Sequence, residues 1–429
     1  MRILLVIIIP FLLVGMASAQ KYSISGYVKD AASGEELIGA NIMVEGANTG
    51  ATTNSYGFYS LSLPAGKYSI RYSYIGYNDE VTEINLTKNQ SRNVSLNSRA
   101  YVTEEIVVTG ERTDRNIQDS RMSVNKLPVE EVKTIPAFMG EVDVLKTIQL
   151  LPGVQSAGDG NSGFYVRGGG PDQNLILLDE AVVYNASHLF GFFSVFNADA
   201  IKDVELYKGG MPAQYGGRVS SVLDISMDNG NMRSYHVDGG IGTIATRLTA
   251  QGPIIPDTAS FLISGRRTYI DILVKPFVRD TSPFKGSGYY FYDFNAKFNY
   301  RFSDKDRVFL SGYYGKDVFT FKSTESNFTM KIPWGNGMVS ARWNHLFNSR
   351  FFLNSTAVFS DYQFSTDVGM KNEDGSDGFR LIQNSGIRDF NFKQDFTWLP
   401  NPKHTVKFGM FYVYHIFTPN TVNADFGDM

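Results

Sequence analysis

Apolar and polar residues alternate along several long segments in the second half of the chain. In residues 290–302 every even position is aromatic or alanine, and the odd positions from 293 onward are Asp, Asn, Lys, Asn and Arg. Residues 386–398 and 405–417 repeat this period of two. The period predicts β-strands with one apolar, aromatic-rich face. Each run is about twice the ~5–6 residues common in soluble strands and fits the ~9–11 residues that a strand needs to cross a membrane.

The connections between these segments alternate in length, which is typical of an outer-membrane β-barrel. We expect tight polar turns at 303–306, 348–349 and 401–403, and longer loops at 275–287, 323–336 and 369–385. The alternative is a soluble β-sandwich or lipocalin-like barrel, and the strand lengths argue against it. The pattern predicts about eight strands, near residues 235–249, 259–274, 289–303, 307–321, 336–348, 350–366, 386–399 and 404–417.

A barrel of eight strands creates a size problem for the preceding part of the chain. Its lumen is just filled by its own side chains, so a separate domain at residues 122–229 could not fit inside it. Either that domain lies outside the barrel, or the complete barrel has more strands than residues 230–429 encode. Because residues 418–429 are polar and loop-like, we expect the sequence to be a C-terminally truncated fragment.

The N-terminal part of the sequence predicts export followed by a small β-domain. Arg2 precedes an apolar run at 3–14, and residues 17–19 are small, so residues 1–19 are expected to be a cleaved signal peptide. The alternative is a membrane anchor, but the run is shorter than the ~17–25 residues of a spanning helix. Residues 20–98 contain six or seven short alternating runs between glycine-containing turns, which predict a β-sandwich.

Residues 122–229 predict a compact domain with a helix and short strands. An apolar stripe in 140–151 favours a helix, and Pro152-Gly153 ends it. Residues 158–163 read G-x-G-x-x-G, but this motif follows a helix and opens a strand, so a flexible loop fits it better than a dinucleotide site. Short β-type runs farther on are separated by glycine clusters at 168–170, 209–210 and 216–217.

Composition narrows the classes of function. The net charge of −3 gives no support to a nucleic-acid partner. The sequence has no cysteine, which excludes disulfides, thiolate zinc sites and a cysteine nucleophile. The five histidines are scattered, and neither H-E-x-x-H nor G-x-S-x-G occurs. We therefore predict no enzyme activity, no catalytic residues, no metal site and no cofactor.

Four motifs in residues 164–227 follow one another in a defined order. They are V-R-G-G at 166–169, L-L-D at 177–179, I-x-x-V-E-L-Y-K-G at 201–209 and Y-G-G-R at 215–218. On these motifs the chain resembles the plug domain of a TonB-dependent outer-membrane receptor. Residues 20–98 resemble the carboxypeptidase-regulatory-like domain, a combination similar to receptors of Bacteroidetes-type bacteria. The resemblance implies a mostly β fold: a β-sandwich, an α+β plug at 122–229, and the first ~8 strands of an antiparallel transmembrane barrel of ~22 strands.

The linker at 99–121 contains one β-prone run between charged residues. The run consists of Glu105, Ile106, Val107, Val108, Thr109 and Gly110. By itself it is explained best as part of an ordinary linker. The resemblance places the TonB box here, and it implies β-augmentation, in which the run pairs as a strand with the periplasmic domain of TonB, a component of the TonB–ExbB–ExbD system.

The resemblance also indicates candidate site residues in the plug. The plug motif residues are Arg167, Gly168, Gly169, Asp179, Gly216, Gly217 and Arg218. We expect Arg167 and Arg218 to form plug–barrel or plug-internal ion pairs; the alternative is a surface arginine of little effect. Many members have glycine after the plug aspartate, whereas this chain has Glu180, which argues against a tight Asp-Gly hairpin.

A polar-aromatic loop at 184–190 supplies the candidate substrate contacts Tyr184, Asn185 and His188. The alternative is that the aromatic residues in and after this loop form the core of the plug.

The predicted function is energy-coupled import of a scarce nutrient, such as siderophore-bound iron, a cofactor, an oligosaccharide or a peptide. The expected location is the outer membrane of a Gram-negative cell, with a multi-pass barrel and a periplasmic N-terminal domain. The expected partners are TonB, outer-membrane lipid and a small ligand. The alternative is a surface-binding or adhesion β-protein that transports nothing, which would need neither a TonB box nor a plug.

Overall fold

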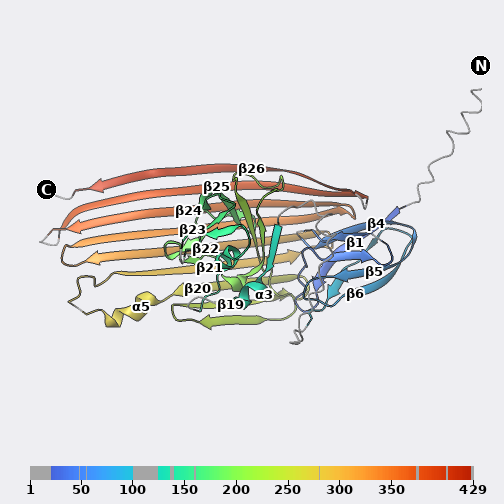
Figure 1. Cartoon of the computed structure of the whole chain (residues 1–429), viewed down its shortest axis with the longest axis horizontal. Helices are drawn as coiled ribbons and strands as arrows, with labels where there is room; N and C mark the ends of the chain where they lie inside the picture. The colour runs from blue at the N-terminus through green and yellow to red at the C-terminus, as the bar shows by residue number, and fades with distance from the viewer. Residues whose placement is uncertain are drawn as a thin grey trace, which may run out of the picture.

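The structure is a computed structural model of the chain, and it describes residues 21–47, 49–54, 56–99, 124–135, 140–158, 161–279, 281–372, 376–401 and 404–426. The expected signal peptide and the expected TonB box both lie outside these described residues. Figure 1 shows three parts: a small β-domain near the N-terminus, a central mixed domain, and one long, curved antiparallel sheet. We call them the sandwich, the plug and the wall.

The sandwich consists of two small sheets packed on a shared apolar core, as the alternating pattern predicts. One sheet has the order β4-β1-β7, with β8 also paired to β1, and the other has the order β3-β2-β5-β6. Inward residues such as Ile24, Ile42 and Ile70 are fully buried between them. The strands are β1 (Lys21–Asp30), β2 (Asn41–Val44), β3 (Gly50–Thr52), β4 (Phe58–Pro64), β5 (Gly66–Ser73), β6 (Glu80–Leu86), β7 (Gln90–Ser91) and β8 (Val94–Leu96).

The plug is built on a five-stranded sheet of order β13-β12-β17-β16-β9. Strands β12 and β17 pair in parallel, and the other pairs are antiparallel. Its sheet strands are β9 (Val124–Pro128), β12 (Asn174–Leu178), β13 (Ala181–Val182), β16 (Ile201–Tyr207) and β17 (Ser221–Met227). Two short hairpin pairs complete it: β10 (Val154–Ser156) with β11 (Phe164–Val166), and β14 (Ser187–His188) with β15 (Phe193–Ser194).

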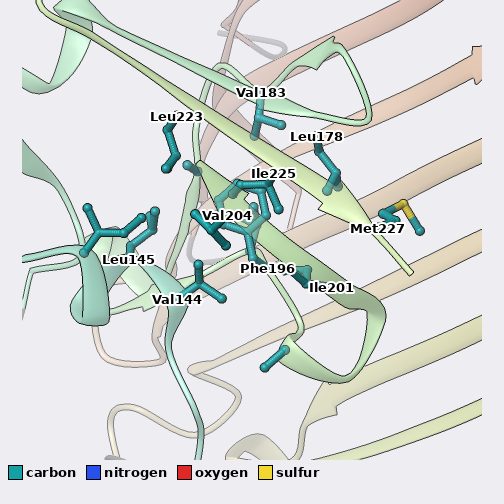
Figure 2. Packing of buried hydrophobic residues seen from close by; sticks show 14 of the residues in the cluster. Val144, Leu145, Leu178, Val183, Phe196, Ile201, Val204, Leu223, Ile225 and Met227 are labelled. Atoms are coloured by element: carbon teal, nitrogen blue, oxygen red, sulfur yellow. The ribbon is translucent and has the colours of Figure 1, made fainter. Parts of the chain in front are cut away.

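The helical elements of the plug are short. They are α3 (Val129–Thr134), α4 (Val144–Gln149), η1 (Pro171–Gln173), η2 (Leu189–Gly191) and η3 (Ala198–Ala200). The helix expected within 140–151 is α4, and it begins late because the side chain of Asp143 caps it by accepting from the backbone N–H groups of Leu145 and Lys146. Figure 2 shows Val144 and Leu145 of α4 beside Val204 of β16 and Ile225 of β17 in the apolar core.

The wall is a nine-stranded antiparallel sheet with neighbours in sequence order from β18 to β26. Its strands are β18 (His236–Ile241), β19 (Ala245–Ile255), β20 (Ala259–Thr268), β21 (Gly288–Arg301), β22 (Asp306–Ser323), β23 (Phe328–Asn348), β24 (Phe351–Lys371), β25 (Asp377–Asn401) and β26 (His404–Asp425). Helices α5 (Ile270–Val274) and η4 (Lys275–Phe277) lie in the long loop before β21. The described sheet is open, with β18 and β26 as its edges.

Four details of the expected wall were wrong. The strand expected at 259–274 ends at Thr268, because residues 270–274 form helix α5, and the residues expected to be loop-like from 418 onward continue strand β26 to Asp425. The first expected strand, 235–249, is divided between β18 and β19 by a turn at Gly242, whose N–H donates to the carbonyl of Ala245. The long loops expected at 323–336 and 369–385 are instead mostly strand, because β22 with β23 and β24 with β25 continue their hydrogen-bond ladders through polar residues. Alternation of apolar residues marks the apolar belt of a strand, whereas the ladder sets its length.

The wall buries polar residues on its plug side and exposes aromatic ones on the other. On β21, Asp293, Asn295 and Lys297 are at most 3% exposed, whereas Phe294 is 47% and Phe298 is 39% exposed. A soluble sheet buries its apolar face against a core, so this arrangement is inverted. An outward apolar face and an inward polar face are the arrangement of a transmembrane β-barrel strand.

Among the described residues, no helix is long and apolar enough to cross a membrane.

Candidate functional site: the buried contact between plug and wall

His188 joins the plug to two strands of the wall. It lies at the end of β14 and is 1% exposed. Its Nε2 lies 2.7 Å from Oδ1 of Asp293 on β21, and its Nδ1 lies 2.6 Å from Oδ2 of Asp317 on β22. The ring also stacks on Phe291, with centroids 4.0 Å apart. Both ring nitrogens are therefore occupied by the wall.

The two carboxylates determine the protonation of His188. Burial by itself would lower the pKa of this imidazole, but the nearby Asp293 and Asp317 outweigh burial and raise the pKa to about 9. The imidazole is therefore charged at neutral pH, and it forms a buried, charge-assisted pair with each carboxylate.

Arg266 of β20 extends this polar cluster toward the helix side of the plug. Its guanidinium contacts Oδ2 of Asp293 at 2.6 Å and donates to the carbonyl of Ser194 at 2.8 Å. A third contact, at 3.6 Å, reaches the carboxylate of Glu141, which is 3% exposed. Two plug segments and three wall strands, β20 to β22, therefore share one buried network of charges, in which a buried charge left without its partner would be costly.

Asp179 forms a second buried ionic contact with the wall. Its carboxylate lies 2.9 Å from Nζ of Lys297, and it accepts the backbone N–H of Met227 at 3.0 Å. Lys297 also donates to the carbonyl of Met227 at 2.8 Å. Burial by itself would raise the pKa of Asp179, but Lys297 and Arg342 lower it overall. Asp179 is thus an ionised anchor between the plug sheet and β21.

The tight hairpin that we expected to be absent after Leu178 is present. Strands β12 and β13 pair Leu178 with Ala181, so Asp179 and Glu180 form a two-residue loop. Both residues have positive φ, 46° and 71°, which such a loop requires and which glycine normally supplies. The ionic contact of Asp179, together with that of Glu180 to Lys393 at 3.5 Å, compensates for this backbone strain.

The other two candidate substrate residues also contact the wall. The hydroxyl of Tyr184 donates to the Asp389 carboxylate on β25, and the carbonyl of Asn185 accepts from Asn336 on β23 at 2.7 Å. The structure thus places Tyr184, Asn185 and His188 at the contact between plug and wall. Tyr184 faces β25, Asn185 faces β23, and His188 faces β21 and β22. A ligand role for them stays a prediction.

The glycines of the plug motif occupy tight positions. Gly168 and Gly217 have positive φ, and a side chain on Gly169 would collide with Ser220. A side chain on Gly216 would press against Phe411 of β26. These positions favour glycine for its conformation or its small size.

The two motif arginines have different surroundings. The guanidinium of Arg167 lies beside Gly209, with its Nη1 2.7 Å from the position that a Cβ atom on residue 209 would occupy. Arg218 donates to the carbonyl of Gly217 at 2.8 Å and has no carboxylate within 4 Å among the described residues. The expectation of an ion pair for Arg218 is therefore not supported by its described contacts.

Sequence reasoning did not single out the wall residues that complete the site. They are Arg266, Asp293, Lys297 and Asp317, with Glu141 from the plug. A usable signal was present, because Asp293 and Lys297 occupy the polar side of the strongest alternating segment. The sequence pattern also did not distinguish Phe190 from the aromatic residues that follow it. Phe190 is 60% exposed and has a φ of 53°, and its ring centroid lies 4.7 Å from that of Trp334.

Among the described residues, no group of three or more His, Cys, Asp or Glu side chains could hold a metal ion.

The comparisons with known proteins agree with this architecture. Residues 24–108 match the CarboxypepD_reg-like domain, and residues 116–221 match the TonB-dependent Receptor Plug Domain. A stretch of 109 residues is 35% identical to the TonB-dependent receptor SusC of Bacteroides thetaiotaomicron, covering 25% of this chain and 10% of that protein. A stretch of 208 residues is 29% identical to the TonB-dependent receptor P26 of Formosa agariphila, covering 46% and 19%.

Among solved structures, the copper transporter OprC shares the fold, with a TM-score of 0.50 at 10% identity over 70% of this chain and 47% of that one. The chain thus carries two domains of known families and is similar to TonB-dependent receptors over its N-terminal half. The alignments span a fifth or less of the length of the two curated relatives, and under half of OprC.

Proposed function

We propose that this chain belongs to an energy-coupled importer of a scarce nutrient, such as siderophore-bound iron, a cofactor, an oligosaccharide or a peptide. The plug is the gate of this importer, and the receptor lies in the outer membrane of a Gram-negative cell with its N-terminal domain in the periplasm. The observation that carries the proposal is the plug–wall contact, which is built from buried charged pairs. Such ion pairs fix the position of the plug, and contacts with water can replace them when the plug is pulled.

The proposed handle for this pull is the run Glu105–Gly110 between the sandwich and the plug. Four adjacent β-branched residues at 106–109 favour an extended strand. We propose that this strand pairs with the periplasmic domain of TonB by β-augmentation, in which main-chain hydrogen bonds supply the affinity. The plug motif glycines and Asp179 then serve to keep the gate folded and seated while force is applied.

Deletion of residues 105–110 tests this function. We expect the deletion to abolish binding of the purified TonB periplasmic domain to the receptor, measured by calorimetry, because it removes the pairing strand. Deletion of residues 112–117 shortens the same linker equally and serves as the matched control, which should bind TonB normally. Val107→Pro, which removes one main-chain N–H, should weaken binding at least about 10-fold. Undiminished binding after deletion of 105–110 would show that this run is not the TonB-binding strand, and no binding of TonB to the intact receptor would favour the non-transporting alternative.

A further inference from the structure

The sandwich contacts the plug and the wall at the same time through two adjacent glutamates. Glu35 lies 2.7 Å from Nζ of Lys202 on plug strand β16. Glu36 forms a salt bridge with Arg307 on wall strand β22. All four side chains are at least 85% buried. Two neighbouring residues of the sandwich thus bind the plug and the wall, respectively. Both ion pairs can form only when the sandwich, the plug and the wall keep fixed positions relative to one another.

On the wall side, aromatic packing and a hydrogen bond supplement this salt bridge. The rings of Tyr56 and Phe58 stack on Phe352 of β24, with centroids 5.4 and 5.8 Å apart. Arg350, in the turn between β23 and β24, donates to the hydroxyl of Ser23 at 2.6 Å. These contacts lie at the end of the wall where the turns are short, and Figure 1 shows the sandwich seated at that end.

On the plug side, backbone groups of the sandwich accept lysine side chains. Lys202 donates to the carbonyl of Glu36 at 2.6 Å, and Lys126 of β9 donates to the carbonyl of Ile38 at 2.9 Å. The segment that joins the plug to the wall is held as well. The N–H of Met232 donates to the carbonyl of Ser33 at 2.8 Å, and the N–H of Asn229 donates to Glu35 at 3.2 Å.

We propose that the sandwich is a latch: its 31–38 loop and Tyr56 tie the plug to the rim of the wall, and the latch must detach before the plug can move. The proposal rests on the proposed function for the direction of the pull. The pulling force acts on the linker between the last sandwich strand and β9. It is therefore transmitted to the latch and to the plug at the same time. A plug that left the wall with the latch closed would have to break the Glu36–Arg307 contact in any case.

The first test uses hydrogen–deuterium exchange on the full-length receptor in bilayers. It measures whether the sandwich is docked on the plug and the wall. Glu36→Gln should speed exchange about 100-fold in peptides covering 31–38 and 228–234, because it breaks a buried pair. The matched control Glu45→Gln removes a solvent-exposed pair with Arg71, at 2.6 Å within the same domain, and should leave both peptides unchanged.

Arg307→Gln provides a second variant that does not alter the sandwich itself. It should reproduce the faster exchange at 31–38 while strand β5 keeps its protection, which shows that the domain undocks without unfolding. Unchanged exchange at 31–38 in Arg307→Gln would overturn the docking that the proposal requires.

The second test measures whether the latch resists the pull. The sequence has no cysteine, so Gly110→Cys gives a unique thiol for attachment to a force probe while the wall is held in a bilayer. We expect a first rupture before the plug extends, and Glu36→Gln should lower its force whereas Glu45→Gln should not. Equal first-rupture forces in these two variants would overturn the latch. The test uses neither TonB nor a ligand, so its failure is distinguishable from a failure of the proposed function.

Discussion

Strands β21 and β26 have the same alternating sequence pattern but different surroundings. In both, aromatic and aliphatic residues on the outward face are largely exposed, among them Phe294 and Phe408. On the inward face of β21, Asp293 and Lys297 are almost completely buried by the plug. On β26, by contrast, every residue but Val413 is exposed or largely so. The strand pattern therefore defines two faces, and the plug decides which polar face is buried.

This difference separates two kinds of inward polar residue. Those of β20 to β22 meet charged plug residues and form specific pairs, because a buried charge without a partner is costly. Those of β26 meet fewer partners, and their polarity is what a water-filled lumen requires. Substitutions on the two strands should therefore have very different costs, and three predictions use this contrast.

The largest expected effect comes from Asp293→Ala on β21. The substitution leaves His188 and Arg266 without a shared buried partner, so the free energy of unfolding should fall by about 4 kcal/mol. Denaturant titration of the receptor in detergent measures the change. Thr405→Ala on β26 is the control and should cost under ~0.5 kcal/mol. Similar costs at the two positions would show that burial by the plug does not distinguish the strands.

A second, somewhat smaller effect is a pH dependence carried by His188. Its pKa rises from 6.5 to about 9 in the folded receptor because of Asp293 and Asp317, despite burial. The charged imidazole therefore stabilises the fold fully below pH ~6.5, and this contribution, about 3 kcal/mol, is lost as the pH rises through ~9. Unfolding titrations across this range measure it.

The variant His188→Gln should lose this pH dependence. His236→Gln, at an exposed position on β18, should keep it and serves as the matched control. If His188→Gln showed the same decline as the wild type between pH 6.5 and 9, the decline would belong to other groups.

The smallest expected effect is on the outward face, where the two strands should behave alike. Phe298→Arg on β21 and Phe408→Arg on β26 each place a charge toward lipid, and each should destabilise the receptor in bilayers by about 2 kcal/mol. Refolding titrations into vesicles measure both. A cost at only one of the two positions would mean that lipid does not reach both outward faces.

Much of the fold could be predicted from local sequence. The sandwich strands, the helix at α4 and most of the wall strands follow directly from their residue periodicity, because burial on one face requires that periodicity. The number of strands and the loop lengths could not be predicted, since the turn at Gly242 and the polar extensions of β22 to β25 depend on hydrogen-bond ladders between strands.

Only the plug residues of the candidate site were predicted from the sequence, and their partners in the wall were not. Asp179 and His188 stood out in the plug, but their partners Lys297, Asp293 and Asp317 are more than 100 residues away in sequence. Local pattern carries no information on which inward positions of the wall the plug will cover. The hairpin at Asp179 and Glu180 illustrates the same limit, because contacts from distant strands compensate for positive φ at residues other than glycine.

The sequence by itself predicted the two-faced strands of the wall and the resemblance to TonB-dependent receptors. It did so because each depends on residues that are neighbours in the chain. Only the tertiary structure decided that the polar face of β21 holds the plug through buried charges, and that Glu35 and Glu36 of the sandwich bind two different bodies. Those outcomes depend on the desolvation of charges, which arises only when distant parts of the chain meet.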